Sequence, residues 1–131
     1  MAEKLASLRK NGVASDIAAD LLWENPTKAS NTGFTLNVAS SKYSKLLCVC
    51  WFEDVGSGWT NTQAVFITHG QNGSPQIMYN VSGYGYVIRS RQFGWTNNVL
   101  TVANGWQMII STSASAYDGS IGKPYQIYGI K

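Results

Sequence analysis

The chain has 131 residues, of which 44% are hydrophobic and 13% are charged, and its formal net charge is +3. This length is enough for one domain that buries a core without a metal or disulfide, and the low charge excludes disorder driven by charge repulsion. The basic residues are scattered and form no stripe that would neutralise several phosphates, and no stretch reaches the roughly 18–20 apolar residues of a membrane span. We therefore expect neither a nucleic-acid nor a membrane partner.

The first twenty residues differ from the remainder of the chain. Leu5, Leu8 and the neighbouring alanines predict a short helix over 2–10, and a second helical turn includes Ile17. Helical pieces this short are unstable alone. We therefore expect an N-terminal arm over 1–20 that attaches the protein to other subunits by burying these three side chains.

From Leu21 onward, short strands alternate with turns rich in Gly, Ser and Asn. Eight or nine strands about 10–12 residues apart, with little helix between them, predict an all-β fold over 21–131, an antiparallel β-sandwich or jelly roll. Strands are expected at 21–23, 33–38, 43–52, 64–68, 76–81, 84–93, 99–102, 106–111 and 125–130.

Three local patterns within this region carry further expectations. Asn104-Gly105 is the strongest two-residue hairpin signal and is expected to join the strands on either side of it. Residues 70–75 are predicted to be a turn-rich linker with positive φ at both glycines. Arg89 and Arg91 fall on one face of the strand over 84–93, where they line either an interface between identical subunits or a solvated sheet face.

Catalytic and metal-binding patterns are missing from the sequence. His69, the only histidine, follows a strand beside Gly70 and is expected to be a solvated turn residue. Cys48 and Cys50 are two apart on one strand, so they are expected to be buried, reduced and unable to bridge each other. No phosphate-binding loop, nucleophile elbow or paired carboxylates are found. We therefore expect no enzyme, no metal and no cofactor.

Aromatic and amide side chains in polar turns are the remaining candidates for binding. Planar rings flanked by amides can stack on sugar rings while the amides bond the hydroxyl groups. Trp59 and Trp95, with Asn61, Asn97 and Asn98, are therefore predicted to bind glycan. The alternative is that these rings plug the ends of the sandwich or pack at a subunit interface. The large aromatics in or beside such turns are Trp59, Tyr84, Trp95 and Tyr117.

Three segments carry a resemblance to a known family. The phrase Leu-Leu-Trp-Glu-Asn-Pro at 21–26, the strand containing Arg89, and Gly-Lys-Pro-Tyr-Gln-Ile-Tyr-Gly-Ile-Lys at 122–131 look like a C-terminal β domain of bacteriophage and prophage virion proteins. Such domains occur in tail-fibre, baseplate and other virion proteins of phages that infect Gram-positive hosts. The resemblance spans about residues 21–131 and marks strand ends, so it assigns no binding residue.

The resemblance implies a β-rich virion module, made in the host cytoplasm, that forms a homotrimer or another homo-oligomer. One placement is a capsid decoration or head-fibre protein, or a tail-associated subunit, attached to other virion proteins by its N-terminal arm. The other is a tail-fibre or baseplate tip adhesin that binds a host surface glycan. Typical tail fibres carry a long shaft before this domain and twenty residues precede it here, so the sequence favours a non-enzymatic structural protein of the first kind.

Overall fold

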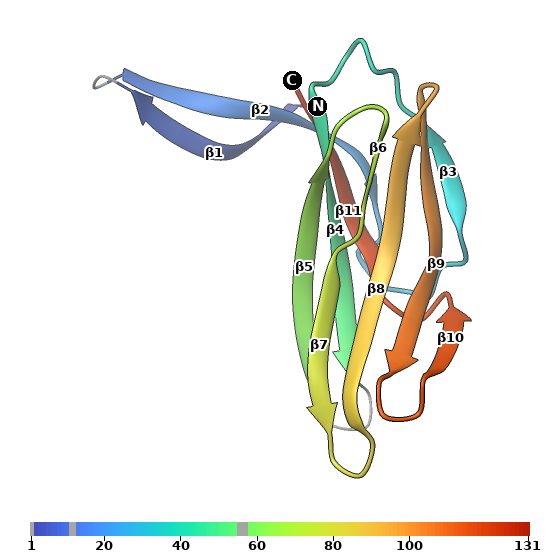
Figure 1. The fold of residues 1–131 in the computed structure, drawn as a ribbon. Coiled ribbons are helices and arrows are strands. Elements are labelled where there is room, and N and C mark those ends of the chain that lie inside the picture. The colour runs from blue at the N-terminus through green and yellow to red at the C-terminus, as the bar shows by residue number, and fades with distance from the viewer. Residues whose placement is uncertain (1, 11–12, 55–57) are drawn as a thin grey trace.

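The computed structural model describes residues 2–10, 13–54 and 58–131, and for residues 2–17 and Asp54 it describes the backbone alone. All the regular structure in these residues is β, with eleven strands and no helix. The strands form two antiparallel sheets that pack face to face (Figure 1). The predicted all-β sandwich is therefore confirmed, with more strands than expected.

The first sheet has five strands, in the order β1-β2-β11-β4-β5. Its central strand, β11, is the last element of the chain and lies between β2 and β4, so the two ends of the chain meet in one sheet. The bounds are β1 (Ala2–Lys10), β2 (Val13–Glu24), β4 (Lys45–Asp54), β5 (Trp59–Ile67) and β11 (Lys123–Ile130).

The second sheet is built on two long strands, β8 and β9, which pair with each other. Each has two short partners along its outer edge: β6 and β7 pair with β8, and β3 and β10 pair with β9. The bounds are β3 (Phe34–Asn37), β6 (Gln71–Gly73), β7 (Gln76–Val81), β8 (Gly85–Thr96), β9 (Val99–Ile109) and β10 (Ala114–Asp118).

The core lies between the two sheets and follows the alternation of the strands. Cys48 and Cys50 of β4 face it, are free and completely buried, and pack with Phe93 of β8 and Leu100 of β9 in one apolar cluster. The prediction of reduced core cysteines is confirmed. Burial raises the pKa of the Cys48 thiol to about 12, so this side chain acts as a small apolar residue.

The predicted helices in the first twenty residues are wrong. The segment forms an antiparallel pair of strands in which Ala2 lies opposite Asp20 and Lys10 lies opposite Val13. β2 then continues across the predicted boundary at residue 20, because its residues from Ala19 onward pair with β11. Pairing of β1 with β2, a strand that continues into the sandwich, has overridden a weak helical period, which is the usual outcome when longer-range pairing competes with local propensity.

The predicted hairpin at Asn104-Gly105 is also wrong. β9 continues through this dipeptide without a turn, and the turn between β8 and β9 is at Asn97-Asn98, where both residues have positive φ, 50° and 60°. Gly105 instead lets the backbone of Ile121 pack closely against β9, since a Cβ at Gly105 would lie 1.8 Å from the carbonyl oxygen of Ile121.

The predicted linker at 70–75 contains a short strand. Gly70 has the expected positive φ of 88°, but Gly73 does not and lies in β6. A Cβ at Gly73 would come within 2.6 Å of the Ile67 side chain, so this glycine lets the two sheets approach. The sequence analysis also missed β10 at Ala114–Asp118.

Candidate functional site

The first candidate is the pair formed by β1 and the first part of β2, which we call the N-terminal hairpin (residues 2–10 and 13–18). In Figure 1 it leaves the sandwich and projects from it, in blue. β1 is the edge strand of its sheet, and β2 is its pairing partner within the described part of the chain. Nine residues of strand reach about 30 Å. A strand edge of this length offers backbone groups to another chain.

The three predicted anchors, Leu5, Leu8 and Ile17, have their backbones in the N-terminal hairpin. Their side chains lie outside the described residues. The backbone register does single out Leu5, because the pairing shifts between Lys4 and Ala6 and leaves Leu5 as the extra residue of a β-bulge.

The root of the N-terminal hairpin is held to the sandwich by polar and apolar contacts. The Asp20 carboxylate accepts a hydrogen bond from the Tyr43 hydroxyl at 2.8 Å and pairs with the Lys131 ammonium at 3.1 Å. These two partners hold the pKa of Asp20 below its usual 3.8. Ala19, next to it, is completely buried and packs in a cluster with Tyr128. The sandwich therefore fixes the strand from which the hairpin extends.

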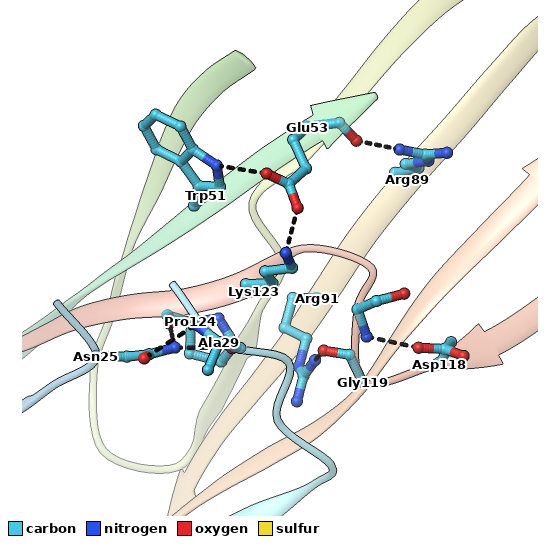
Figure 2. A network of polar contacts seen from close by, with 11 residues as sticks. Asn25, Ala29, Trp51, Glu53, Arg89, Arg91, Asp118, Gly119, Lys123 and Pro124 are labelled. Carbon is cyan, nitrogen blue, oxygen red and sulfur yellow. Dashed lines mark hydrogen bonds and ion pairs between the residues drawn. The ribbon is translucent and has the colours of Figure 1, made fainter. Parts of the chain in front are cut away.

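Two of the three segments that carry the family resemblance lie side by side, and they run away from this root. Residues 21–26 belong to the end of β2 and the turn after it, and residues 122–131 contain β11, with which β2 pairs. The buried Asn25 joins them, since its side-chain amide donates to the carbonyl of Pro124 at 3.2 Å and to that of Ala29 at 2.9 Å (Figure 2). Their role in this structure is to tie β2 to β11.

Arg91 lies inside the sandwich, so neither surface predicted for it applies. Its side chain is completely buried, and its guanidinium donates to three backbone carbonyls: Asn31 at 2.7 Å, Ile121 at 3.4 Å and Gly119 at 3.5 Å. Burial lowers the pKa of Arg91, and its Nε has no partner within the described residues. Arg91 therefore holds two loops against the sandwich and is not available to a partner subunit.

Arg89, two residues earlier on the same inward face, belongs to a polar network near one end of the sandwich (Figure 2). It donates to the backbone carbonyl of Glu53 and, at 2.7 Å, to the side chain of Gln107. The Glu53 carboxylate pairs with Lys123 and accepts a hydrogen bond from the Trp51 indole at 3.3 Å. The bond from Lys123 is the main cause that lowers the pKa of Glu53. The Lys123–Glu53 ion pair and the bonds of Arg89 hold β4, β8 and β11 together.

The residues predicted to bind glycan do not form one site, and Trp95 is the clearest error. Its side chain is completely buried, and its indole donates to the carbonyl of Val38 at 2.9 Å. Asn97 and Asn98 make the β8–β9 turn, and the Asn98 side chain accepts a hydrogen bond from the Ser40 amide at 2.8 Å. Trp95 and Asn98 therefore hold the 38–40 loop in place.

Trp59 and Asn61 lie toward the opposite end of the sandwich. Trp59 contacts Tyr79 edge to face, with ring centroids 4.6 Å apart, and both line a hollow of about 390 Å³ with Asn61. Tyr79 is paired with Val87, which precedes Trp95 by eight residues of β8, or about 26 Å. A single small ligand cannot reach both groups.

A further surface, whose residues were not predicted from the sequence to lie together, is on the outside of the six-stranded sheet. Trp106 of β9 and Tyr117 of β10 are directly opposite each other and border a hollow of about 520 Å³. The sequence carried one signal for this surface: over 55–117, Arg89 and Arg91 are the only charged residues. Both point inward, so the outside of this sheet is uncharged over β7, β8 and β9.

Comparison with known proteins gives no relative: no family model, curated protein or solved structure matches the chain. The resemblance to phage virion domains therefore stays a prediction. His69 is an exposed turn residue, as expected. Within the described residues, no cluster of His, Cys, Asp and Glu could hold a metal ion, and no helix is long and apolar enough to span a membrane.

Proposed function

We propose that this chain is a non-enzymatic structural protein of a bacteriophage particle, a capsid decoration, head-fibre or tail-associated subunit whose N-terminal hairpin attaches it to neighbouring virion proteins. The observation that carries the proposal is the projection of the hairpin from a sandwich that is complete without it (Figure 1). The resemblance of residues 21–131 to phage domains supports the choice of assembly.

The proposed attachment works by strand addition. A two-stranded hairpin is marginally stable alone in water, because one strand pair buries too little surface. A strand from a neighbouring protein beside β1 would extend the sheet and satisfy the backbone groups along its free edge. Side chains of Leu5, Leu8 and Ile17 that become buried there would each contribute roughly 1.5–3 kcal/mol.

Repetition strengthens such an attachment. If several copies are joined, as the resemblance implies, the hairpins bind together and the second and third contacts form at high effective concentration. Each hairpin also has to stay joined to its own sandwich. The root provides this connection, because the pairing of Asp20 with Lys131 and the burial of Ala19 tie the hairpin strand to the sandwich. Force on the hairpin is then passed directly to β11.

The test is a deletion that removes the hairpin and spares its root. Residues 1–17 are removed, and Ala18 is kept because its carbonyl accepts the Lys131 amide at 3.3 Å. We expect the truncated chain to stay folded by circular dichroism and to be absent from purified particles. A matched control, Tyr84→Ala at the exposed β7–β8 turn, is expected to be incorporated normally.

Incorporation of the truncated chain at the level of the intact one would contradict the proposal. A second variant, Leu5→Asp with Leu8→Asp, changes side chains without shortening the chain and is expected to lower incorporation in the same direction. Normal incorporation of this variant would limit the attachment to the backbone of β1.

A further inference from the structure

We propose that the outer face of the six-stranded sheet binds an uncharged carbohydrate chain, laid along β8 and β9 between Tyr117 and Thr96. This goes beyond attachment to a particle, and it assigns a binding site to residues other than those predicted from the sequence. Three features of this face support such a ligand: its lack of charge, its shape, and the unpaired polar groups that line it.

The lack of charge restricts the class of ligand. β7 and β9 contain no charged residue, and the two arginines of β8, Arg89 and Arg91, are engaged inside the sandwich. A polyanion such as a nucleic acid or a sulfated glycan needs several exposed cations, which this face does not offer. Neutral ligands are therefore the ones it fits.

The shape of the face comes from an irregularity in the sheet. The β8–β9 register shifts between Arg91, opposite Gly105, and Phe93, opposite Val102, so β9 carries one extra residue there. A bulge of this kind bends the strand and increases its twist. On the other side of β8, β6 ends at Gly73 and β7 begins at Gln76, which leaves this stretch of edge without a strand.

Two adjoining hollows result. The larger, of about 520 Å³, lies between Tyr117 and the β6–β7 connection, and the smaller, of about 180 Å³, continues along β8 as far as Thr96. They share Gln92 and Ala103 as lining residues. From Ser90 to Thr96 the path follows β8 for about 20 Å, which is long enough for several sugar rings.

The lining chemistry matches a ligand with apolar ring faces and many hydroxyl groups. Trp106 and Tyr117 lie opposite each other in the β9–β10 register at one end, where both line the larger hollow, and Tyr117 is 72% exposed. Asn104 is held in orientation because its side-chain oxygen accepts the Gly33 amide at 2.7 Å, which directs the remaining NH₂ donors elsewhere. The groove thus has a stacking surface and an oriented amide.

Other polar groups along the groove are unused. Ser74, Ser90 and Gln92 line the larger hollow, and their side chains make no hydrogen bond within the described part of the chain. A protein partner that covered them with apolar surface would leave these donors and acceptors unsatisfied, at a cost to binding. Sugar hydroxyl groups can both donate and accept, so they can pair with each of these groups.

The experiment uses the full chain on an array of neutral oligosaccharides, namely gluco-, manno-, galacto- and N-acetylhexosamine chains, with sulfated and sialylated chains as charged comparators. We expect the protein to bind one or more of the neutral oligosaccharides and to show no preference for the charged ones. The affinity for the oligosaccharide that binds is then measured by calorimetric titration. We expect Tyr117→Ala to weaken this affinity about tenfold or more. Gln92→Leu, which removes an amide shared by both hollows, is expected to weaken binding in the same way.

Controls separate this site from the remainder of the surface. Tyr84→Ala removes another exposed tyrosine, and Trp59→Ala removes the tryptophan of the other hollow, so both are expected to bind like the intact chain. Tyr117 lies on an exposed edge strand, so its removal tests binding without disturbing the core.

Several outcomes would overturn the proposal: no binding to any neutral chain, preference for charged chains, or equal weakening by Tyr84→Ala and Tyr117→Ala. A dimer in light scattering that Tyr117→Ala dissociates would also overturn it, because the face would then be a protein interface. None of these results affects attachment, which the deletion of residues 1–17 tests separately.

Discussion

The N-terminal hairpin and the sandwich are made of the same kind of strand, yet they are held by different interactions. Strands of the sandwich pair with neighbours and bury side chains such as Phe93 and Leu100 against the opposite sheet. The described backbone of the hairpin is held by pairing between β1 and β2 alone. Folding and attachment therefore depend on separate parts of one continuous sheet, so changes in one part should leave the other intact.

The largest expected effect is on the sandwich, from Arg91→Ala. This change removes the donors of three buried or partly buried carbonyls and leaves a space between the sheets, so we expect the free energy of unfolding to fall by about 3 kcal/mol. Urea denaturation measures the change. Leu8→Ala in the hairpin is the comparison, and it should alter stability by less than about 0.5 kcal/mol. Equal effects of the two would erase the distinction between the regions.

A smaller loss is expected from Gly105→Ala. The added methyl group would overlap the Ile121 carbonyl, a backbone atom that must move, so we expect a loss of about 1–3 kcal/mol. Gly83→Ala is the control, since its Cβ meets open space and only its φ of 85° opposes the change, at about 1 kcal/mol. A smaller loss at Gly105 than at Gly83 would show that the 119–122 loop is not packed on β9 as described.

The next effect concerns pH. Because the folded state lowers the pKa of Glu53 below its usual 4.5 and that of Asp20 below 3.8, these groups stabilise the fold above those values. Stability should therefore fall as the pH drops below about 4.5. Glu53→Gln should lower stability at pH 7, by about 1 kcal/mol for a partly exposed pair, and the difference from the intact chain should shrink in acid. A difference that grows in acid would have the wrong sign.

The smallest expected change is chemical. Cys48 and Cys50 are completely buried, and burial raises the pKa of both thiols, so a disulfide reagent should leave the native protein unmodified. Both should react fully in denaturant. Fast labelling of the folded chain would show that the core between β4 and β8 opens readily.

The sequence predicted most strands of the sandwich because their signal is local. The apolar run around Cys48 and the alternation at Phe34 and Leu36 are visible without knowledge of any partner strand. The hairpin was missed because its strands are defined by pairing, which a weak helical period concealed. The prediction of a hairpin at Asn104-Gly105 failed for a related reason. The glycine is needed there because the Ile121 carbonyl, distant in sequence, packs against it, and not because the chain turns.

The candidate binding residues were harder to predict. Trp95 lies beside a polar turn, as surface aromatics often do, but its side chain is in the core. Arg91 is a charged residue inside the sandwich, against the general preference of arginine for the surface. The pairing of Trp106 with Tyr117 depends on the register of β9 and β10, which no property of either segment alone reveals.

Attachment through the N-terminal hairpin can be followed by hydrogen–deuterium exchange of the backbone amides of residues 2–10 and 13–18, measured by mass spectrometry in the free chain and in assembled particles. If the hairpin is the attachment element, its amides exchange fast in the free chain, where β4 and β11 exchange slowly, and they become strongly protected on assembly. Exchange from the hairpin that is equally fast in particles, or already as slow as in β11 in the free chain, would contradict it.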